Sequence, residues 1–193
     1  MQRFTVLILF ALIPACQPAY INGTPNERSP YFEVPVDSKL ILNRTITVEA
    51  GQKSAYFQRG QQLKWFNVDK YAAYCALTLD RELKTEQTIE PGELEVYKVF
   101  NQHLFQIAKA RSPSAPTGDF RPQTVQMRDG GRDTYQVLAV IMELRSAVKS
   151  DVRRLICANW VVPQGMQSVT VNGIRQSLGD FASLKLAPTT DKR

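Results

Sequence analysis

Alternation of apolar and polar residues is the dominant pattern of the chain from residue 31 onward. In residues 39–48, KLILNRTITV, Leu40, Leu42, Ile46 and Val48 fall on one face, and Lys39, Asn43, Thr45 and Thr47 fall on the other. A period of two predicts a half-buried strand, and we expect one strand over this stretch. The same alternation in residues 71–79 and 94–99 predicts two more strands. Residues 136–144 are the most hydrophobic stretch after the first fifteen residues and predict the central strand, with another over residues 152–162.

Near the C-terminus the period changes from two to that of a helix. Val171, Ile174 and Leu178 have helical spacing, Thr170 precedes them as an N-cap, and Gly179 follows as a C-cap. One short helix is therefore expected, followed by a last strand in FASLKL. The sequence predicts a mainly β fold, an antiparallel sandwich or open barrel of about eight strands with one short C-terminal helix. Two connections stand out: a long exposed loop over residues 111–122, and a hairpin turn at Asp129-Gly130-Gly131.

The first thirty residues have a different composition. An apolar run of twelve residues, 4–15, follows Arg3, and a membrane-spanning helix would need about 20. The run has the length of the apolar region of a signal peptide. Residues 17–30 contain three prolines and few apolar side chains. We therefore expect a signal peptide over 1–15, lipid attachment and a flexible tether over 16–30, a single β-rich domain over 31–186, and a C-terminal tail over 187–193.

Cys16 ends the apolar run, and its surroundings resemble a bacterial lipobox. In LIPAC, Ala15 and Ile13 match the lipobox pattern, whereas Pro14 departs from its usual small or hydroxyl residue. The resemblance implies that Cys16 carries a lipid anchor. Gln17 is not the aspartate associated with retention in the inner membrane, so the outer membrane, facing the periplasm, is favoured. The alternative is ordinary cleavage after Ala15, which would give a periplasmic or secreted protein with Cys16 as a terminal thiol that is free or joins two chains.

The count of cysteines bears on the same choice. The chain has three cysteines, Cys16, Cys75 and Cys157, and thiols in an oxidising compartment tend to pair. A lipid on Cys16 leaves Cys75 and Cys157, each in a predicted strand, to form a disulfide. Without the lipid, one thiol is left over.

The chain as a whole resembles a group of exported proteins, some of them lipoproteins, of proteobacteria. The resemblance rests on residues 31–60, on the cysteine strand YCALTL, on DVRRLICANW and on IRQSLGDF. It implies a location in the bacterial envelope. It implies no activity and no catalytic residues.

The positive net charge, +6, is compatible with an anionic partner. Six arginines flank the long loop or lie on a later strand, and they would form an anion-binding rim if the loop and hairpin reach the same end of the fold: Arg111, Arg121, Arg128, Arg132, Arg153 and Arg154. Another envelope protein or anionic lipid would suit such a rim. Only Phe120 adds an aromatic ring to the loop, so nucleic-acid binding is not expected.

The sequence offers little for catalysis. His103 is the only histidine, no nucleophile or phosphate-loop motif is present, and we expect neither a metal nor a cofactor. Carboxylate pairs such as Glu90 and Glu93 leave an exported hydrolase as the alternative function. The primary hypothesis is a lipid-anchored envelope protein that acts as a binding, accessory or structural module.

Overall fold

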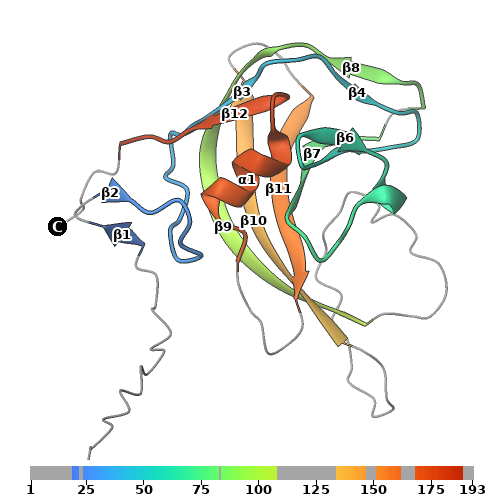
Figure 1. Cartoon of the computed structure of the whole chain (residues 1–193). Coiled ribbons are helices and arrows are strands. Elements are labelled where there is room, and N and C mark those ends of the chain that lie inside the picture. The colour runs from blue at the N-terminus through green and yellow to red at the C-terminus, as the bar shows by residue number, and fades with distance from the viewer. Residues whose placement is uncertain are drawn as a thin grey trace, which may run out of the picture.

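The computed structural model describes residues 19–21, 24–82, 84–107, 134–146, 151–161 and 168–188. Its centre is one antiparallel sheet that curls into a half-barrel (Figure 1). The eight strands follow in the order β12 (Ala182–Lys185), β3 (Lys39–Leu42), β9 (Gly92–Ile107), β10 (Thr134–Ser146), β11 (Val152–Val161), β7 (Tyr74–Leu79), β5 (Ser54–Gln58) and β6 (Gln61–Leu63). The predicted fold class is confirmed, and β10, which contains the hydrophobic residues 136–144, lies in the middle of the sheet.

Smaller elements surround the half-barrel. β1 (Tyr20–Ile21) pairs with β2 (Thr24–Pro25), and β4 (Ile46–Val48) pairs with β8 (Gln87–Ile89). The single strand predicted over residues 39–48 is wrong in one respect, because the chain leaves the large sheet after Leu42 and resumes as β4 in a separate pair. Arg44, at the break, forms an ion pair with Asp180 at 3.2 Å. A 3-10 turn, η1 (Trp65–Asn67), follows β6.

The predicted helix is present as α1 (Val171–Leu178), the one α-helix in the part of the chain that the structure describes. The side chain of Thr170 caps it by accepting a hydrogen bond from the backbone N–H of Gly173 at 3.0 Å. Its buried residues Val171, Ile174 and Leu178 pack on the face of the sheet formed by β5, β7 and β12. We call this the inner face and the opposite one the outer face.

Each face of the sheet has its own apolar cluster, as strand alternation requires. Along β7, Cys75, Leu77 and Leu79 belong to the inner cluster, whereas Tyr74 and Ala76 belong to the outer one. β5, β10 and β11 divide in the same way. The outer cluster also receives the partly buried rings of Trp65, Phe100 and Trp160.

The predicted disulfide joins Cys75 and Cys157 within the inner cluster. The two residues lie directly opposite each other on β7 and β11, with their Cα atoms 4.0 Å apart. Both are fully buried. The bridge connects neighbouring strands whose cysteines are 82 positions apart in sequence.

The described residues before β3, 19–21 and 24–38, contact the rest of the domain at several points. Ala19 contacts the inner cluster, Ser29 is fully buried, and the Arg175 guanidinium of α1 forms an ion pair with Glu27. The backbone N–H of Asn172 also donates to the Glu27 carbonyl at 2.9 Å. The packed domain therefore begins well before residue 31, inside the stretch predicted as a tether. Cys16 lies outside the described residues. So do four of the six arginines of the predicted rim, Arg111, Arg121, Arg128 and Arg132.

Candidate binding surface

Four residues from three separate parts of the chain, Trp65, Lys70, Tyr71 and Trp160, contact one another on the outer face. Together with the exposed Phe66, which follows Trp65 in sequence, we call them the aromatic surface. Trp65 and Phe66 come from η1, Lys70 and Tyr71 from the turn that leads to β7, and Trp160 from the end of β11. The strand order brings them together, because β11 is the neighbour of β7 in the sheet. A backbone hydrogen bond from the Trp160 N–H to the Lys70 carbonyl, 2.7 Å long, joins the turn to β11.

Buried tyrosines support the aromatic surface from below. The ring centroid of Trp65 lies 5.1 Å from that of Tyr56 and 5.8 Å from that of Tyr74. Trp160 and Tyr71 meet edge to face at 6.2 Å. Such tilted arrangements suit the quadrupoles of aromatic rings and fix the planes of the two indoles.

Lys70 lies between the two indoles. Its Nζ is 4.8 Å from the centroid of the Trp65 ring and 6.0 Å from that of Trp160, and it donates to the Val68 carbonyl at 3.4 Å. An ammonium over an indole face is attracted by the ring quadrupole. Lys70 thus holds one positive charge at the centre of an otherwise apolar surface.

Two rings of this surface are largely exposed. Phe66 is 70% exposed and Tyr71 is 55% exposed. The indole Nε1 of Trp65 is buried and has no hydrogen-bond partner in the structure. An exposed phenylalanine beside two tryptophans and a lysine is the composition of a contact surface, since aromatic residues are enriched at interfaces.

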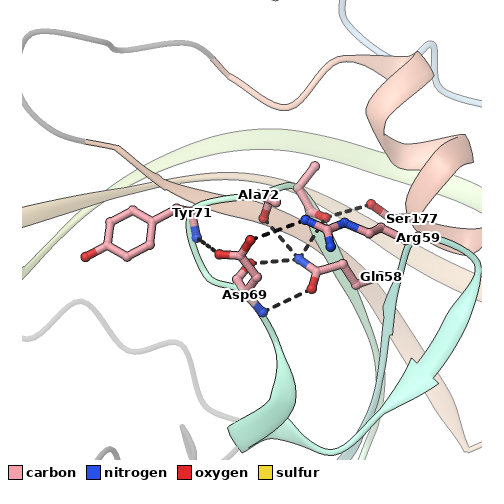
Figure 2. A network of polar contacts seen from close by, with 7 residues as sticks. Gln58, Arg59, Asp69, Tyr71, Ala72 and Ser177 are labelled. Atoms are coloured by element: carbon pink, nitrogen blue, oxygen red, sulfur yellow. Dashed lines mark hydrogen bonds and ion pairs between the residues drawn. The ribbon is translucent and has the colours of Figure 1, made fainter.

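A buried amide positions the turn that carries Lys70 and Tyr71 (Figure 2). Gln58, at the end of β5, is 3% exposed. Its Nε2 donates to the carbonyls of Asp69 at 2.7 Å and Ala73 at 3.3 Å, and its Oε1 accepts from the Asp69 N–H at 3.0 Å. The Asp69 carboxylate in turn accepts from the Tyr71 N–H and pairs with Arg59. The Ser177 hydroxyl of α1 donates to the Ala73 carbonyl at 3.1 Å.

Replacing Gln58 with methionine is expected to loosen this turn. Methionine keeps the volume of glutamine but leaves the backbone groups of Asp69 and Ala73 without partners, at a cost of about 1–3 kcal/mol. Urea denaturation measures the loss, and native tryptophan emission reports the rearrangement around Trp65 and Trp160. Gln61→Met, at an exposed position of β6, is the matched control and should change neither. Equal effects of the two variants would contradict the role given to Gln58.

The buried tyrosines predict a loss of stability at alkaline pH. Burial raises the pKa of Tyr74, and a hydrogen bond from Trp160 opposes the rise only in part. Burial also raises the pKa of Tyr56. A raised pKa in the folded state stabilises the protein fully below the unfolded pKa, about 10, and this contribution is lost as the pH rises above it. The free energy of unfolding should therefore fall above pH 10, and the fall should be shallower in Tyr74→Phe. Denaturation measured from pH 8 to 11 tests this, and parallel slopes would contradict it.

Two of the six arginines of the predicted rim lie among the described residues, and both belong to the outer face. The register of β11 against β7 shifts between Val152 and Arg154, so that two residues occupy the space of one. As a result Val152 and Leu155 both reach the inner cluster, and Arg153 and Arg154 lie between them on the other side. Arg153 pairs with Asp80 at 2.8 Å. Arg111, Arg121, Arg128 and Arg132 lie outside the described residues, so the rim as a whole stays a prediction.

Glutamates lie next to the arginines of β10 and β11. Glu143 is directly opposite Arg154 in the register of β10 and β11. It also accepts a hydrogen bond from Tyr97, which raises the pKa of that phenol. Farther along, Arg145 donates to Glu95 at 2.6 Å, and this hydrogen bond holds the pKa of the Glu95 carboxyl below its usual range. The charges of Arg153 and Arg145 are therefore compensated by neighbouring carboxylates.

The carboxylates considered for a hydrolase are both exposed, Glu90 just before β9 and Glu93 at its start. Glu93 pairs with Lys39 at 2.6 Å, and Glu90 accepts from the Thr45 hydroxyl at 3.4 Å. Within the described ranges, no three His, Cys, Asp or Glu side chains gather closely enough to hold a metal ion. The backbone of His103 lies in β9, opposite Leu138.

Comparisons with known proteins found no match to a protein-family model, to a curated protein or to a solved structure. In the part of the chain that the structure describes, no helix has the length and apolar character needed to cross a membrane.

Sequence reasoning missed the aromatic surface. The signal available to it was the density of aromatic and basic residues in KWFNVDKY, residues 64–71, which contains no periodic pattern. Trp160 is 95 positions from Trp65, and only the pairing of β11 with β7 brings them into one cluster.

Proposed function

We propose that the chain is an exported, lipid-anchored protein of a bacterial envelope that acts as a binding or accessory module. Cys16 carries the anchor, and the aromatic surface is the binding site. The domain itself is a rigid, disulfide-braced support for that surface.

The disulfide is the observation that carries this proposal. Cys75 and Cys157 are joined in the inner core, so Cys16 is the one cysteine of the chain left for another purpose. Disulfides of this kind form and persist in oxidising compartments outside the cytosol. Cys16 also follows directly on an apolar run and lies in a lipobox-like context. Export and lipidation account for all of these features together.

The aromatic surface supports binding as the activity. The turn that carries Tyr71 is held by the hydrogen bonds of Gln58 and Asp69, and a binding group on a fixed backbone loses little conformational entropy when it binds. In Figure 1, η1 lies next to β6, an edge strand of the sheet, whereas β1 and β2 lie on the opposite side of the half-barrel. A surface placed there is directed away from an anchor at Cys16 and remains accessible to a partner.

The anchor is tested by the intact mass of unreduced native protein extracted from membranes. The expected mass begins at Cys16, adds a diacylglyceryl group and an acyl chain, and lacks the two hydrogens removed by the disulfide. A soluble product without lipid would contradict the anchor and favour a secreted protein with a terminal thiol at position 16.

The binding site is tested by photo-crosslinking in living cells that export the protein. A photoreactive phenylalanine analogue at position 66 or 71 is expected to give discrete adducts with an envelope component. The same analogue at Tyr97, which is also exposed on the outer face but lies among ion pairs, is the control and should give none. Adducts of equal yield from all three positions, or from none, would contradict the assignment of the aromatic surface.

A further inference from the structure

The attachment of the N-terminal segment leaves almost no free chain between a lipid on Cys16 and the folded domain. Ala19 is three positions after Cys16, and its side chain already packs against the inner cluster. Three residues span at most about 11 Å even when fully extended. A flexible tether over residues 16–30 would instead have allowed the domain to move about 20 Å from the membrane.

Hydrogen bonds continue this attachment step by step toward residue 32. The N–H of Asn26 donates to the Ala19 carbonyl at 2.8 Å, the N–H of Ser29 donates to the Asn26 carbonyl at 2.8 Å, and the N–H of Phe32 donates to the Ser29 carbonyl at 3.3 Å. Phe32 and Val34 are buried in the inner cluster. The segment is therefore part of the domain, and an anchor at Cys16 would fix the orientation of the domain as well as its distance from the membrane.

The same segment carries three large apolar side chains that the fold leaves uncovered. Ile21 is 53% exposed, Tyr31 is 69% exposed and Val36 is 49% exposed. In the described part of the chain six large apolar residues are exposed, and these are three of the six. Tyr31 and Val36 flank the buried Phe32 and Val34, so their exposure follows from the way the segment packs. Ile21 is five positions from Cys16 and cannot lie more than about 18 Å from it.

We propose that Ile21, Tyr31 and Val36 form a membrane-facing surface that rests on the lipid bilayer in which Cys16 is anchored. The inference rests on the proposed lipid anchor. The short link places the segment at the level of the lipid headgroups, where amphipathic and aliphatic side chains gain by leaving water. The domain is thereby held with β1 and β2 toward the membrane and η1 away from it (Figure 1).

Charge does not contribute much to this contact. The exposed ionisable residues between positions 24 and 38 are Arg28, Glu33 and Asp37, which sum to a net charge of −1. The Glu33 carboxylate accepts a hydrogen bond from Asn101 of β9 at 3.3 Å. We therefore expect the contact to be the same on zwitterionic and on anionic membranes and to be insensitive to salt.

Quenching of tryptophan emission by brominated lipids tests the orientation. The lipidated protein is reconstituted in phosphatidylcholine vesicles with brominated acyl chains, and Tyr31→Trp is compared with Phe66→Trp and with the unaltered protein. Both substitutions replace one exposed ring by another and share the background of Trp65 and Trp160. The emission added by Tyr31→Trp should be lost in brominated vesicles, whereas that added by Phe66→Trp should persist. Replacing half of the phosphatidylcholine by phosphatidylglycerol should leave both results unchanged.

Each alternative result would contradict a different part of the proposal. Quenching of the unaltered protein, whose tryptophans both belong to the aromatic surface, would show that this surface faces the bilayer and would overturn the proposed orientation. Lipidated protein with no quenching in any variant would overturn the membrane-facing surface while leaving the anchor in place. A native mass without lipid would overturn both the anchor and the inference that rests on it.

Discussion

Gly179→Ala is expected to destabilise the protein by about 3 kcal/mol or more, because two separate costs coincide at this position. Gly179 ends α1 with φ 53° and ψ −131°, a conformation that residues with a side chain avoid. A Cβ added there would lie 2.4 Å from the Cα of Gly60, in the turn between β5 and β6. That turn cannot move away from α1 without losing a hydrogen bond, because the Gly60 N–H donates to the Ser177 carbonyl of α1 at 3.1 Å.

Two other glycines provide a graded comparison. Gly60 has φ 72°, but a Cβ on it would meet Gly179 only at 3.4 Å, so Gly60→Ala should cost about 1 kcal/mol from its backbone alone. Gly92 has no atom within 4 Å of the added Cβ, so Gly92→Ala should be neutral or slightly stabilising. Urea denaturation of the three variants measures the order. If Gly179→Ala lowered the free energy of unfolding no more than Gly60→Ala, the close approach of the two backbones would be refuted.

Loss of the Cys75–Cys157 bridge is expected to have a similarly large effect. The chain-entropy model gives about 4.5 kcal/mol for a bridge that closes a loop of 82 residues, and measured losses fall at about 2–5 kcal/mol. Cys75→Ala combined with Cys157→Ala should lose this amount and a further increment for the sulfur atoms missing from the core. Denaturation of the oxidised protein, the reduced protein and the double variant separates the two contributions, because the reduced protein keeps both sulfur atoms.

The burial of the bridge also predicts how it is reduced. Both cysteines are fully buried in the inner cluster, so a small reductant reaches them only when the sheet opens. The rate of reduction should therefore rise steeply with urea in parallel with unfolding, and trapping of the released thiols measures it. Rapid reduction of the native protein, or equal stabilities of the oxidised and reduced forms, would contradict this account.

The sequence predicted the local elements because each has a signal within a few residues. Alternation in residues 71–79 identified β7 and assigned Cys75 and Leu77 to the same face, and the caps at Thr170 and Gly179 delimited α1 to the residue. It also predicted the pairing of Cys75 with Cys157, since a lipid on Cys16 would leave no other choice. Polar segments carry no such signal. Residues 17–30 were predicted to be a tether because their contacts, such as the ion pair of Glu27 with Arg175, are made with distant parts of the chain.

By itself, then, the sequence determined most of the strands, which of their sides is buried, and the helix. It determined the partner of each core cysteine only under the hypothesis that Cys16 carries a lipid. Only the tertiary structure decided which strands are neighbours, and this created the features on which the proposed function rests. The pairing of β11 with β7 brings Trp160 close to Lys70, which also contacts Trp65. The bulge in β11 places Arg153 and Arg154 on the same face of the sheet. The physical reason is that alternation specifies which side of a strand is buried, whereas strand order is set by packing among residues far apart in the chain.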